Sequence, residues 1–242
     1  MKKYLPRLAV AAAALLSMGA AQSAVITFDG LSPSPLATNM PLLGDGDEFY
    51  QSGYFFAPFS NQPGALAGDL VGAIVDGADV ANTCFSVACP TNNSTHFYTA
   101  LNDGVLYMGS NSGAPFMLQG LSASFVGAAG DVFPSTTLIL RAQGSKVGGG
   151  SLTASINLPG PVGGAFSFAN YSFNPTFANT PMTAIFFFGL ACNSGGSCSA
   201  FSSDKGQFAL DNISVVPEPS EWLMLGLGLL AVGAVVRRRN AA

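Results

Sequence analysis

The sequence contains very few charged residues. Of its 242 residues, 13 are acidic and 9 are basic, whereas about a quarter of the residues of a soluble domain are usually charged. Because 49% of its residues are hydrophobic and few are charged, the chain does not have the composition of an intrinsically disordered protein. The stretch from Val25 to Val215 has three basic and eleven acidic residues, a net charge of −8. Because so acidic a body repels phosphate backbones, we expect no binding to nucleic acid.

Histidine and tryptophan are almost absent. His96 is the only histidine, and Trp222 is the only tryptophan. A hydrolytic triad would have to use His96, and no Gly-x-Ser-x-Gly elbow is present to supply the nucleophile. Sites with two or three histidine ligands are excluded by count. We therefore predict that His96 lies in a loop or at a strand edge, and that the protein is not an enzyme.

Helical periodicity is also missing, and alternation with a period of two dominates. Residues 151–157 alternate apolar and polar side chains without a fault, so Leu152, Ala154 and Ile156 share one face. Further strands are predicted at residues 25–28, 53–56, 105–108, 116–126, 137–142, 165–173, 184–190 and 207–215. Nine or so short strands predict an all-β fold, a single β-sandwich of jelly-roll type over residues 25–215.

Two of these strands change their alternation partway along. Phe166 and Phe168 have one parity and Tyr171 and Phe173 the other, so an extra residue near Ala169 would turn all four rings toward the core. A second change of parity falls at Asp211 and Asn212 in the last strand. Burying Asp211 without a partner is costly, so we expect backbone N–H groups, water or a cation beside it.

The first 24 residues have the composition of a secretory signal peptide. A basic start with Lys2, Lys3 and Arg7 precedes an apolar run at residues 8–16 and then small residues. That run is about half the ~20 residues that a transmembrane helix needs. We expect export and removal by signal peptidase between Ala21 and Val25.

The last 27 residues, 216–242, combine three features in a fixed order. Pro217, Glu218 and Pro219 come first, an apolar run of 15 residues from Trp222 to Val236 follows, and the basic cluster Arg237, Arg238 and Arg239 comes last. As a helix the run would be about 22 Å long, short of the ~30 Å hydrocarbon core, so it could span a membrane or be held there transiently. Trp222 would lie at one interface, with the three arginines on the cytoplasmic side.

This tail resembles the PEP-CTERM protein-sorting signal of Gram-negative bacteria, with Pro217, Glu218 and Pro219 matching the motif. The resemblance implies recognition by an exosortase, transient anchoring in the inner membrane, and transfer of the body to the cell surface or extracellular matrix, where exopolysaccharide and biofilm are made. A plain C-terminal membrane anchor is the alternative.

The first and last strands carry a second resemblance. Residues 207–215 resemble the closing strand of galactose-binding-like and carbohydrate-binding jelly rolls, and residues 26–31 are similar to the first strand of many PEP-CTERM proteins. In the jelly-roll families a structural calcium often lies between these strands. The resemblance implies that Asp29 and Asp211 are calcium ligands, with backbone carbonyls completing six to eight positions. Capped turn or bulge aspartates are the alternative.

Four cysteines, Cys84, Cys89, Cys192 and Cys198, make an even count, which indicates disulfides in an exported chain. Pairing of nearest neighbours closes two short loops, and two other pairings would join distant loops. A zinc site is the alternative. Residues 45–48 begin like a calcium loop, but Phe49 replaces a ligand, so a solvated turn is predicted there.

The function expected from these features is that of a noncatalytic exported protein associated with exopolysaccharide. Sugar rings could stack on the body's tyrosines, whose default role is core packing; these are Tyr50, Tyr54, Tyr98, Tyr107 and Tyr171. The alternatives are a glycan-hydrolysing enzyme, which needs two carboxylates in an aromatic cleft, and an adhesin with a flat apolar patch.

Overall fold

The computed structural model describes residues 23–31, 42–84, 87–128, 138–193, 195–201, 205–217 and 228. The predicted signal peptide lies outside the described residues except for residues 23–24, and the predicted sorting tail except for residues 216–217 and 228. Among the described residues, no helix is both long enough and apolar enough to cross a membrane.

The described part of the chain is predominantly β, which confirms the all-β prediction. The strands up to residue 110 are β1 (Ala24–Ile26), β2 (Leu42–Gly44), β3 (Phe49–Gln51), β4 (Tyr54–Phe59), β5 (Leu70–Asp76), β6 (Val87–Ala88), β7 (His96–Ala100) and β8 (Val105–Ser110). The later strands are β9 (Phe116–Phe125), β10 (Gly127–Ala128), β11 (Leu138–Lys146), β12 (Ser151–Leu158), β13 (Ala169–Ser172), β14 (Met182–Cys192), β15 (Cys198–Ser199) and β16 (Phe208–Pro217).

Between residues 23 and 217, the described helical structure is limited to short connections. A 3-10 turn, η1 (Gly77–Asp79), leads into α2 (Val80–Thr83), and α3 (Pro175–Ala178) precedes β14. The Asp76 carboxylate accepts a hydrogen bond from the Ala78 N–H at the start of η1, and the Asn174 side chain accepts one from the Phe177 N–H at the start of α3. These bonds satisfy backbone donors that a helix start leaves unpaired.

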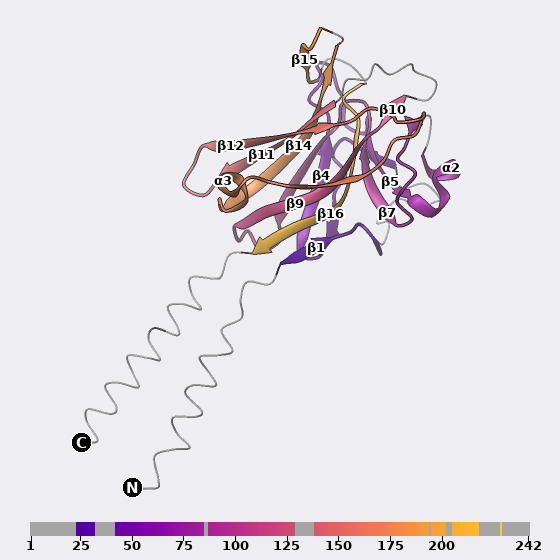
Figure 1. Cartoon of the computed structure of the whole chain (residues 1–242). Coiled ribbons are helices and arrows are strands. Elements are labelled where there is room, and N and C mark those ends of the chain that lie inside the picture. Colours follow the sequence, from indigo (N-terminus) through magenta and orange to yellow (C-terminus); the bar gives the residue numbers. More distant parts are fainter. Residues whose placement is uncertain are drawn as a thin grey trace, which may run out of the picture.

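Most strands form one curled antiparallel sheet (Figure 1). One half has the order β2-β5-β7-β16-β9, with β1 added to β16 and β13 added to β9. The other half has the order β14-β8-β4-β3, and β14 also pairs with β15 and with the β11–β12 hairpin. A single residue pair, Met182 with Phe116, joins the two halves. The two layers of the predicted sandwich are therefore joined at one corner, where β9 meets β14, and form one continuous sheet. The jelly-roll type of the sandwich stays a prediction.

Aromatic side chains fill the space between the halves. Tyr54 of β4 packs edge-on against Phe116 of β9 with ring centroids 5.1 Å apart. Phe28, just after β1, lies 5.5 Å from the Phe56 ring and 6.2 Å from the Tyr98 ring. These rings are all buried, and each buried side chain of this size stabilises the fold by about 1.5–3 kcal/mol.

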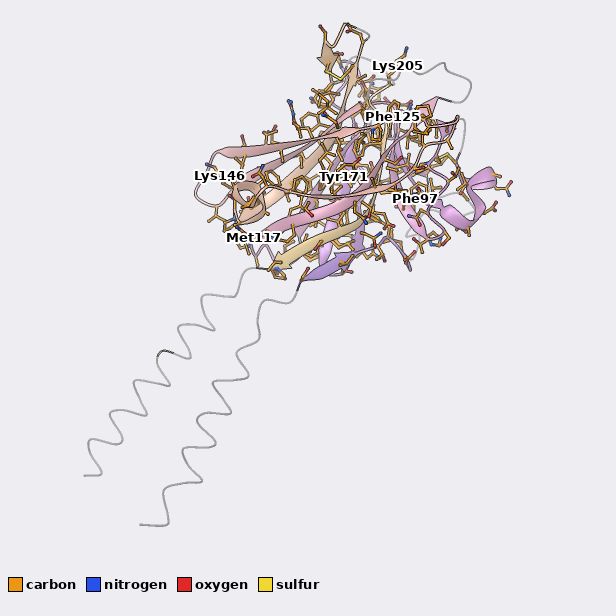
Figure 2. All side chains as sticks on the ribbon, viewed as in Figure 1. Phe97, Met117, Phe125, Lys146, Tyr171 and Lys205 are labelled. Atoms are coloured by element: carbon orange, nitrogen blue, oxygen red, sulfur yellow. A yellow bond between two sulfur atoms is a disulfide. The ribbon has the colours of Figure 1, made fainter. Side chains whose placement is uncertain are left out.

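A second, smaller core covers the outer face of the first half. It contains Ala73, Val75, Cys89, Phe97, Leu101, Val126 and Ala209, with α2, β6 and Phe168 packed against it. The Phe97 ring, labelled in Figure 2, meets the Phe168 ring edge-on at 5.1 Å. This half of the sheet is therefore covered by protein on both faces.

The parity change predicted in the last strand is confirmed. The register of β16 against β9 shifts between Asp211 and Ser214, and Asn212 has a φ of 48°. The extra residue predicted near Ala169 is wrong, because β13 begins only at Ala169 and pairs with β9 without a shift. Phe168 lies before the strand in irregular chain and packs on the smaller core, while Phe166 and Phe173 are buried in the main core.

Candidate functional site

The four cysteines form two disulfides, Cys84–Cys89 and Cys192–Cys198. The pairing of nearest neighbours is thus the one observed, and the zinc alternative is wrong. The second disulfide links the end of β14 to β15, and the Asn193 side chain inside its loop accepts hydrogen bonds from the N–H groups of Gly195 and Ser197. Disulfides of this kind persist in oxidising compartments, which fits an extracellular location.

Asp29 and Asp211 are brought together near the first and last strands. Asp211 is only 1% exposed, and its carboxylate accepts bonds from Asn93 Nδ2 at 2.8 Å and from the Asn212 N–H at 2.7 Å. Burial raises the pKa of Asp211 to about 6, and the charge of Asp29 adds to the rise, while hydrogen bonds from Asn212, Asn93 and Thr95 oppose it. Of the partners expected beside this buried carboxylate, a backbone N–H group is present, whereas the asparagine side chains that also bind it were not expected.

The Asp29 carboxylate holds the start of β7. Its Oδ1 accepts the His96 N–H at 2.9 Å and lies 3.5 Å from His96 Nδ1. His96 is half-exposed and is the first residue of β7, so it lies where a loop enters a strand, which fits the prediction of a loop or strand-edge position.

Two carboxylates alone do not complete a calcium shell. Both oxygens of Asp211 already accept N–H bonds from Asn93 and Asn212, and the described residues contain no group of three or more His, Cys, Asp or Glu side chains placed to hold a metal. A calcium ion would need six to eight oxygens, supplied mostly by carbonyls and water. Calcium binding by Asp29 and Asp211 stays a prediction.

The carboxylates of the Asp45–Glu48 segment bind the protein itself. Asp47 accepts a bond from the Gly44 N–H, Asp45 accepts one from the Ser60 N–H, and Glu48 accepts one from the Tyr50 hydroxyl. The structure assigns these residues to a turn between β2 and β3, as predicted.

The sorting motif lies almost wholly outside the described residues. Pro217 ends β16 and pairs with Phe116, whereas Glu218, Pro219, Trp222 and Arg237–Arg239 are not among the described residues. Ala24 of β1 pairs with Val215 of β16, so the two ends of the domain leave it side by side (Figure 1).

Two groups of contacting aromatic rings lie on the outer side of the second half of the sheet and meet at a shared hollow. The rings, called the aromatic face below, are Tyr50, Phe55, Phe59, Tyr107, Phe186, Phe188 and Phe201. Neighbours in the sequence on the same strands point inward and are buried, among them Phe49, Phe56 and Phe187. This alternation follows from the period-two geometry of a strand. Tyr50 is 58% exposed and the other six rings are partly exposed.

The rings touch from strand to strand. The centroid of the Tyr107 ring is 5.3 Å from that of Phe55 and 5.1 Å from that of Phe186. Tyr107 pairs directly with Phe186 across β8 and β14 and with Ala57 across β8 and β4. A Cβ at Gly109 would come within 2.5 Å of the Phe55 ring, so glycine is needed for that ring to lie against the sheet.

Polar side chains continue the same surface on the β11–β12 hairpin. Gln143 pairs with Phe186 and Arg141 pairs with Phe188, so the two side chains extend the aromatic rows. Arg141 Nε also lies 3.4 Å from the Ser155 hydroxyl of β12. The surface thus has apolar rings beside hydrogen-bonding groups.

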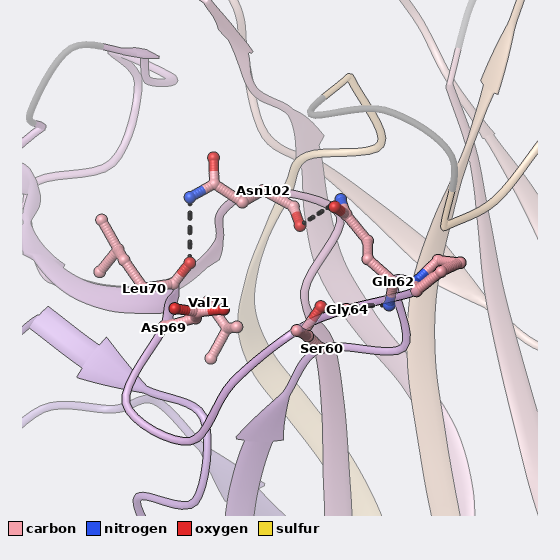
Figure 3. A pocket seen from close by; sticks show the side chains of 9 residues that line it. Ser60, Gln62, Gly64, Asp69, Leu70, Val71 and Asn102 are labelled. Atoms are coloured by element: carbon pink, nitrogen blue, oxygen red, sulfur yellow. Dashed lines mark hydrogen bonds between the residues drawn. The ribbon is translucent and has the colours of Figure 1, made fainter.

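Two hollows open on either side of the segment after β4. The aromatic hollow, about 260 Å³, is lined by Phe59, Asn61, Val105, Gln143, Phe186, Phe188 and Phe201. The polar hollow, about 420 Å³ and shown in Figure 3, is lined by Ser60, Gln62, Pro63, Gly64, Ala65, Asp69, Leu70, Val71 and Asn102. In it, Gln62 donates to the Asn102 carbonyl and Asn102 donates to the Leu70 carbonyl (Figure 3). Alternate residues from 59 to 62 line one hollow and then the other.

The sequence named two of the seven aromatic-face residues, Tyr50 and Tyr107, as able to stack on sugars. Tyr54 and Tyr98 belong to the main core, where burial raises the pKa of both hydroxyls, and Tyr171 is partly buried against it. The five phenylalanines were missed as surface residues. The signal that could have found them is parity, because strands β4 and β14 carry aromatic side chains at both odd and even positions, and only one set can face the core.

Comparisons with known proteins give a limited result. No family model matches the sequence, and no curated protein matches it. A family 61 carbohydrate-binding module solved with β-1,4-galactotriose is 8% identical, with 69% of this chain and 90% of the module aligned and a TM-score of 0.32. A family 16 carbohydrate-binding module is 12% identical over 60% of this chain and 85% of its own, with a TM-score of 0.26.

A third similar structure is the enzymatically active domain of tailspike protein 4 from bacteriophage CBA120. It is 13% identical, covering 69% of this chain and 19% of the tailspike chain, with a TM-score of 0.31. Because these scores are low, the proposals that follow rest on the residues of this chain.

Proposed function

We propose that this protein is a noncatalytic, exported component of the cell surface or extracellular matrix that binds neutral polysaccharide through its aromatic face. The observation that carries the proposal is this row of contacting rings, from Tyr50 to Phe186, partly exposed beside Gln143 and Arg141. Among the described residues, the smaller core covers the other half of the sheet and not this one. Aromatic rings present apolar surface at fixed orientation, and neighbouring polar groups fix the direction of a bound molecule.

The charge of the protein favours a neutral ligand. The body carries a net charge of −8, which repels anionic polymers, and the described lining of the aromatic hollow has no carboxylate to attract cationic ones. A neutral polysaccharide chain offers both apolar ring faces and hydroxyl groups, which match the rings and the amide and guanidinium groups of this surface.

The proposal that the protein is not an enzyme is supported by the position of its acids. Glycoside hydrolysis needs two carboxylates flanking the scissile bond, and the described lining of the aromatic hollow offers Asn61 and Gln143 as its polar side chains. Asp211 accepts hydrogen bonds from Asn93 and Asn212, and Asp29 accepts one from the His96 N–H. Neither carboxylate is in the described lining of the aromatic hollow.

Sorting completes the proposal. The predicted signal peptide directs export, and the tail beginning at Pro217 is recognised by an exosortase after transient insertion in the inner membrane of a Gram-negative bacterium. Both disulfides support an oxidising destination. The pairing of β1 with β16 supports the proposed route, because a domain whose two ends leave together keeps the rest of its surface free when either end is at the membrane.

The test is binding to polysaccharide by affinity electrophoresis in gels containing soluble galactan, glucan or mannan, with alginate as the anionic comparison. We expect retardation by at least one neutral polymer. Tyr107→Ala should weaken binding by about tenfold, the loss expected of a central aromatic contact, and Tyr50→Ala, at the end of the row, should weaken it less. Tyr50→Phe keeps the ring and should bind like the original protein.

The control is Leu66→Ala, which removes an exposed apolar side chain from the loop before β5 that is not one of the rings of the aromatic face. It should leave binding unchanged. Equal weakening by Leu66→Ala and Tyr107→Ala, or binding to alginate alone, would contradict the proposal.

A further inference from the structure

One edge of the described sheet is formed by a long strand, β12, with α3 packed near it. Strand β12 has eight residues, Ser151 to Leu158, and all eight pair with β11 on one side. Among the described residues, β12 pairs with no other strand. Figure 1 places the β11–β12 hairpin at the margin of the molecule. A strand edge of this kind presents a row of backbone donors and acceptors that another strand can pair with.

The sequence of β12 contains none of the usual protections. It has no charged residue and no proline, and its register against β11 is unbroken. The residues on its exposed face, Ser151, Thr153, Ser155 and Asn157, are small and neutral, while Ala154, Ile156 and Leu158 are buried beneath. Natural sheets normally block such edges with lysine, proline, a bulge or a very short strand.

The other described edges of this sheet are protected in those ways. Strand β2 has three residues, contains a register shift after Leu43 and runs into Asp45. Strand β3 also has three residues and follows Glu48. Strand β13 has four residues. Strand β12 is therefore longer than these other described edge strands and lacks their protections.

We propose that β12 pairs antiparallel with β12 of a second copy of this chain, so that the two sheets continue into each other. An antiparallel strand is self-complementary about a two-fold axis, which is the usual symmetry of a homodimer. The charges agree with this arrangement, because the charged residue beside the turn of the hairpin is Lys146, the last residue of β11 (Figure 2). Antiparallel pairing places the two Lys146 side chains at opposite ends of the shared strands.

The pairing would also affect ligand binding. A two-fold axis perpendicular to the joined sheets puts both aromatic faces on the same side. A long polysaccharide could then contact both, and the second contact would occur at a high effective concentration. This consequence rests on the proposed function, whereas the pairing itself does not.

The test is the mass of the full chain, purified in mild detergent without sugar, by light scattering during gel filtration. We expect the protein mass of a dimer. The variant with Thr153→Lys and Asn157→Lys should have the mass of a monomer, because lysine on an edge strand opposes pairing. Since the termini are the same in every variant, association through them would not respond to these substitutions.

The matched control is Ser172→Lys, which places lysine on the exposed face of the short edge strand β13. It should remain a dimer. A monomeric original protein at all concentrations would overturn the proposal, as would a dimer that the β12 lysines leave intact or that Ser172→Lys dissociates equally. Circular dichroism of each variant checks that it is folded. If the double variant is misfolded, Thr153→Lys and Asn157→Lys are tested separately, and each should weaken the dimer.

Discussion

Asp211 is an acidic residue in a buried environment that disfavours its negative charge. A carboxylate that is 1% exposed is costly to ionise, and here it lies near a second carboxylate, Asp29. The donors from Asn93 and Asn212 reduce this cost without removing it, so the pKa of Asp211 is raised to about 6. The folded protein therefore holds the Asp211 proton more tightly than the unfolded chain does.

This preference predicts how stability depends on pH. An unfolded aspartate ionises near pH 4, so from about pH 4 to pH 6 the unfolded state loses this proton before the folded state does. Stability contributed by Asp211 is present below about pH 4 and is lost as pH rises to about 6, by at most about 3 kcal/mol. In Asp211→Asn, this part of the pH dependence should disappear.

The measurement is urea unfolding of both proteins with chelator present, between pH 4 and pH 7.5. The difference in free energy of unfolding between them should change across this window and be constant above it. Parallel curves for the two proteins would show that Asp211 ionises in the fold as it does in the unfolded chain.

At the scale of elements, the segments after β1 and before β7 meet at the bulge of β16. Asp29 binds the first residue of β7, and Asn93 joins the segment before β7 to Asp211 of β16. Asp29 follows the first strand and Asp211 belongs to the last. The resemblance to jelly rolls implies a calcium ion between these two strands.

If a cation is held at this junction, it would stabilise the contact between elements far apart in the sequence. We then expect calcium to raise the midpoint of thermal unfolding and chelator to lower it. Asp29→Asn should abolish the difference between the two conditions. Magnesium, which prefers a smaller octahedral shell, is the matched control and should shift the midpoint less. Identical melting with calcium and with chelator would remove calcium from this site.

The strands with clear alternation, such as β12 and β11, were predicted from the sequence. The missed strand β5, Leu70 to Asp76, has five consecutive buried residues, because it is covered by the main core on one face and by the smaller core on the other. Such a strand shows no alternation. The aromatic face was missed for a related reason, since a phenylalanine such as Phe186 is assigned to the core by default and only the pairing of strands shows which side it faces.

For the whole molecule, processing decides what the mature protein is. Sorting by an exosortase predicts that released protein lacks Trp222 and everything after it. Intact-mass spectrometry of the protein recovered outside the cell should therefore give a chain ending near residue 220. Replacing Pro217, Glu218 and Pro219 by alanine should leave the protein uncleaved and membrane-bound. A released protein that keeps Trp222 would contradict sorting, and an uncleaved membrane-bound original protein would favour the plain anchor.

The position of β16 also has a mechanical consequence. This strand lies between β9 and β7, and its last residues, Val216 and Pro217, still pair with Met117 and Phe116. A pull on the tail would act along the strand, so the hydrogen bonds of the β9–β16 ladder would bear the load together. While the tail is in the membrane, flow or a growing polymer outside the cell would strain this ladder as a whole, and the domain would resist extraction by shear.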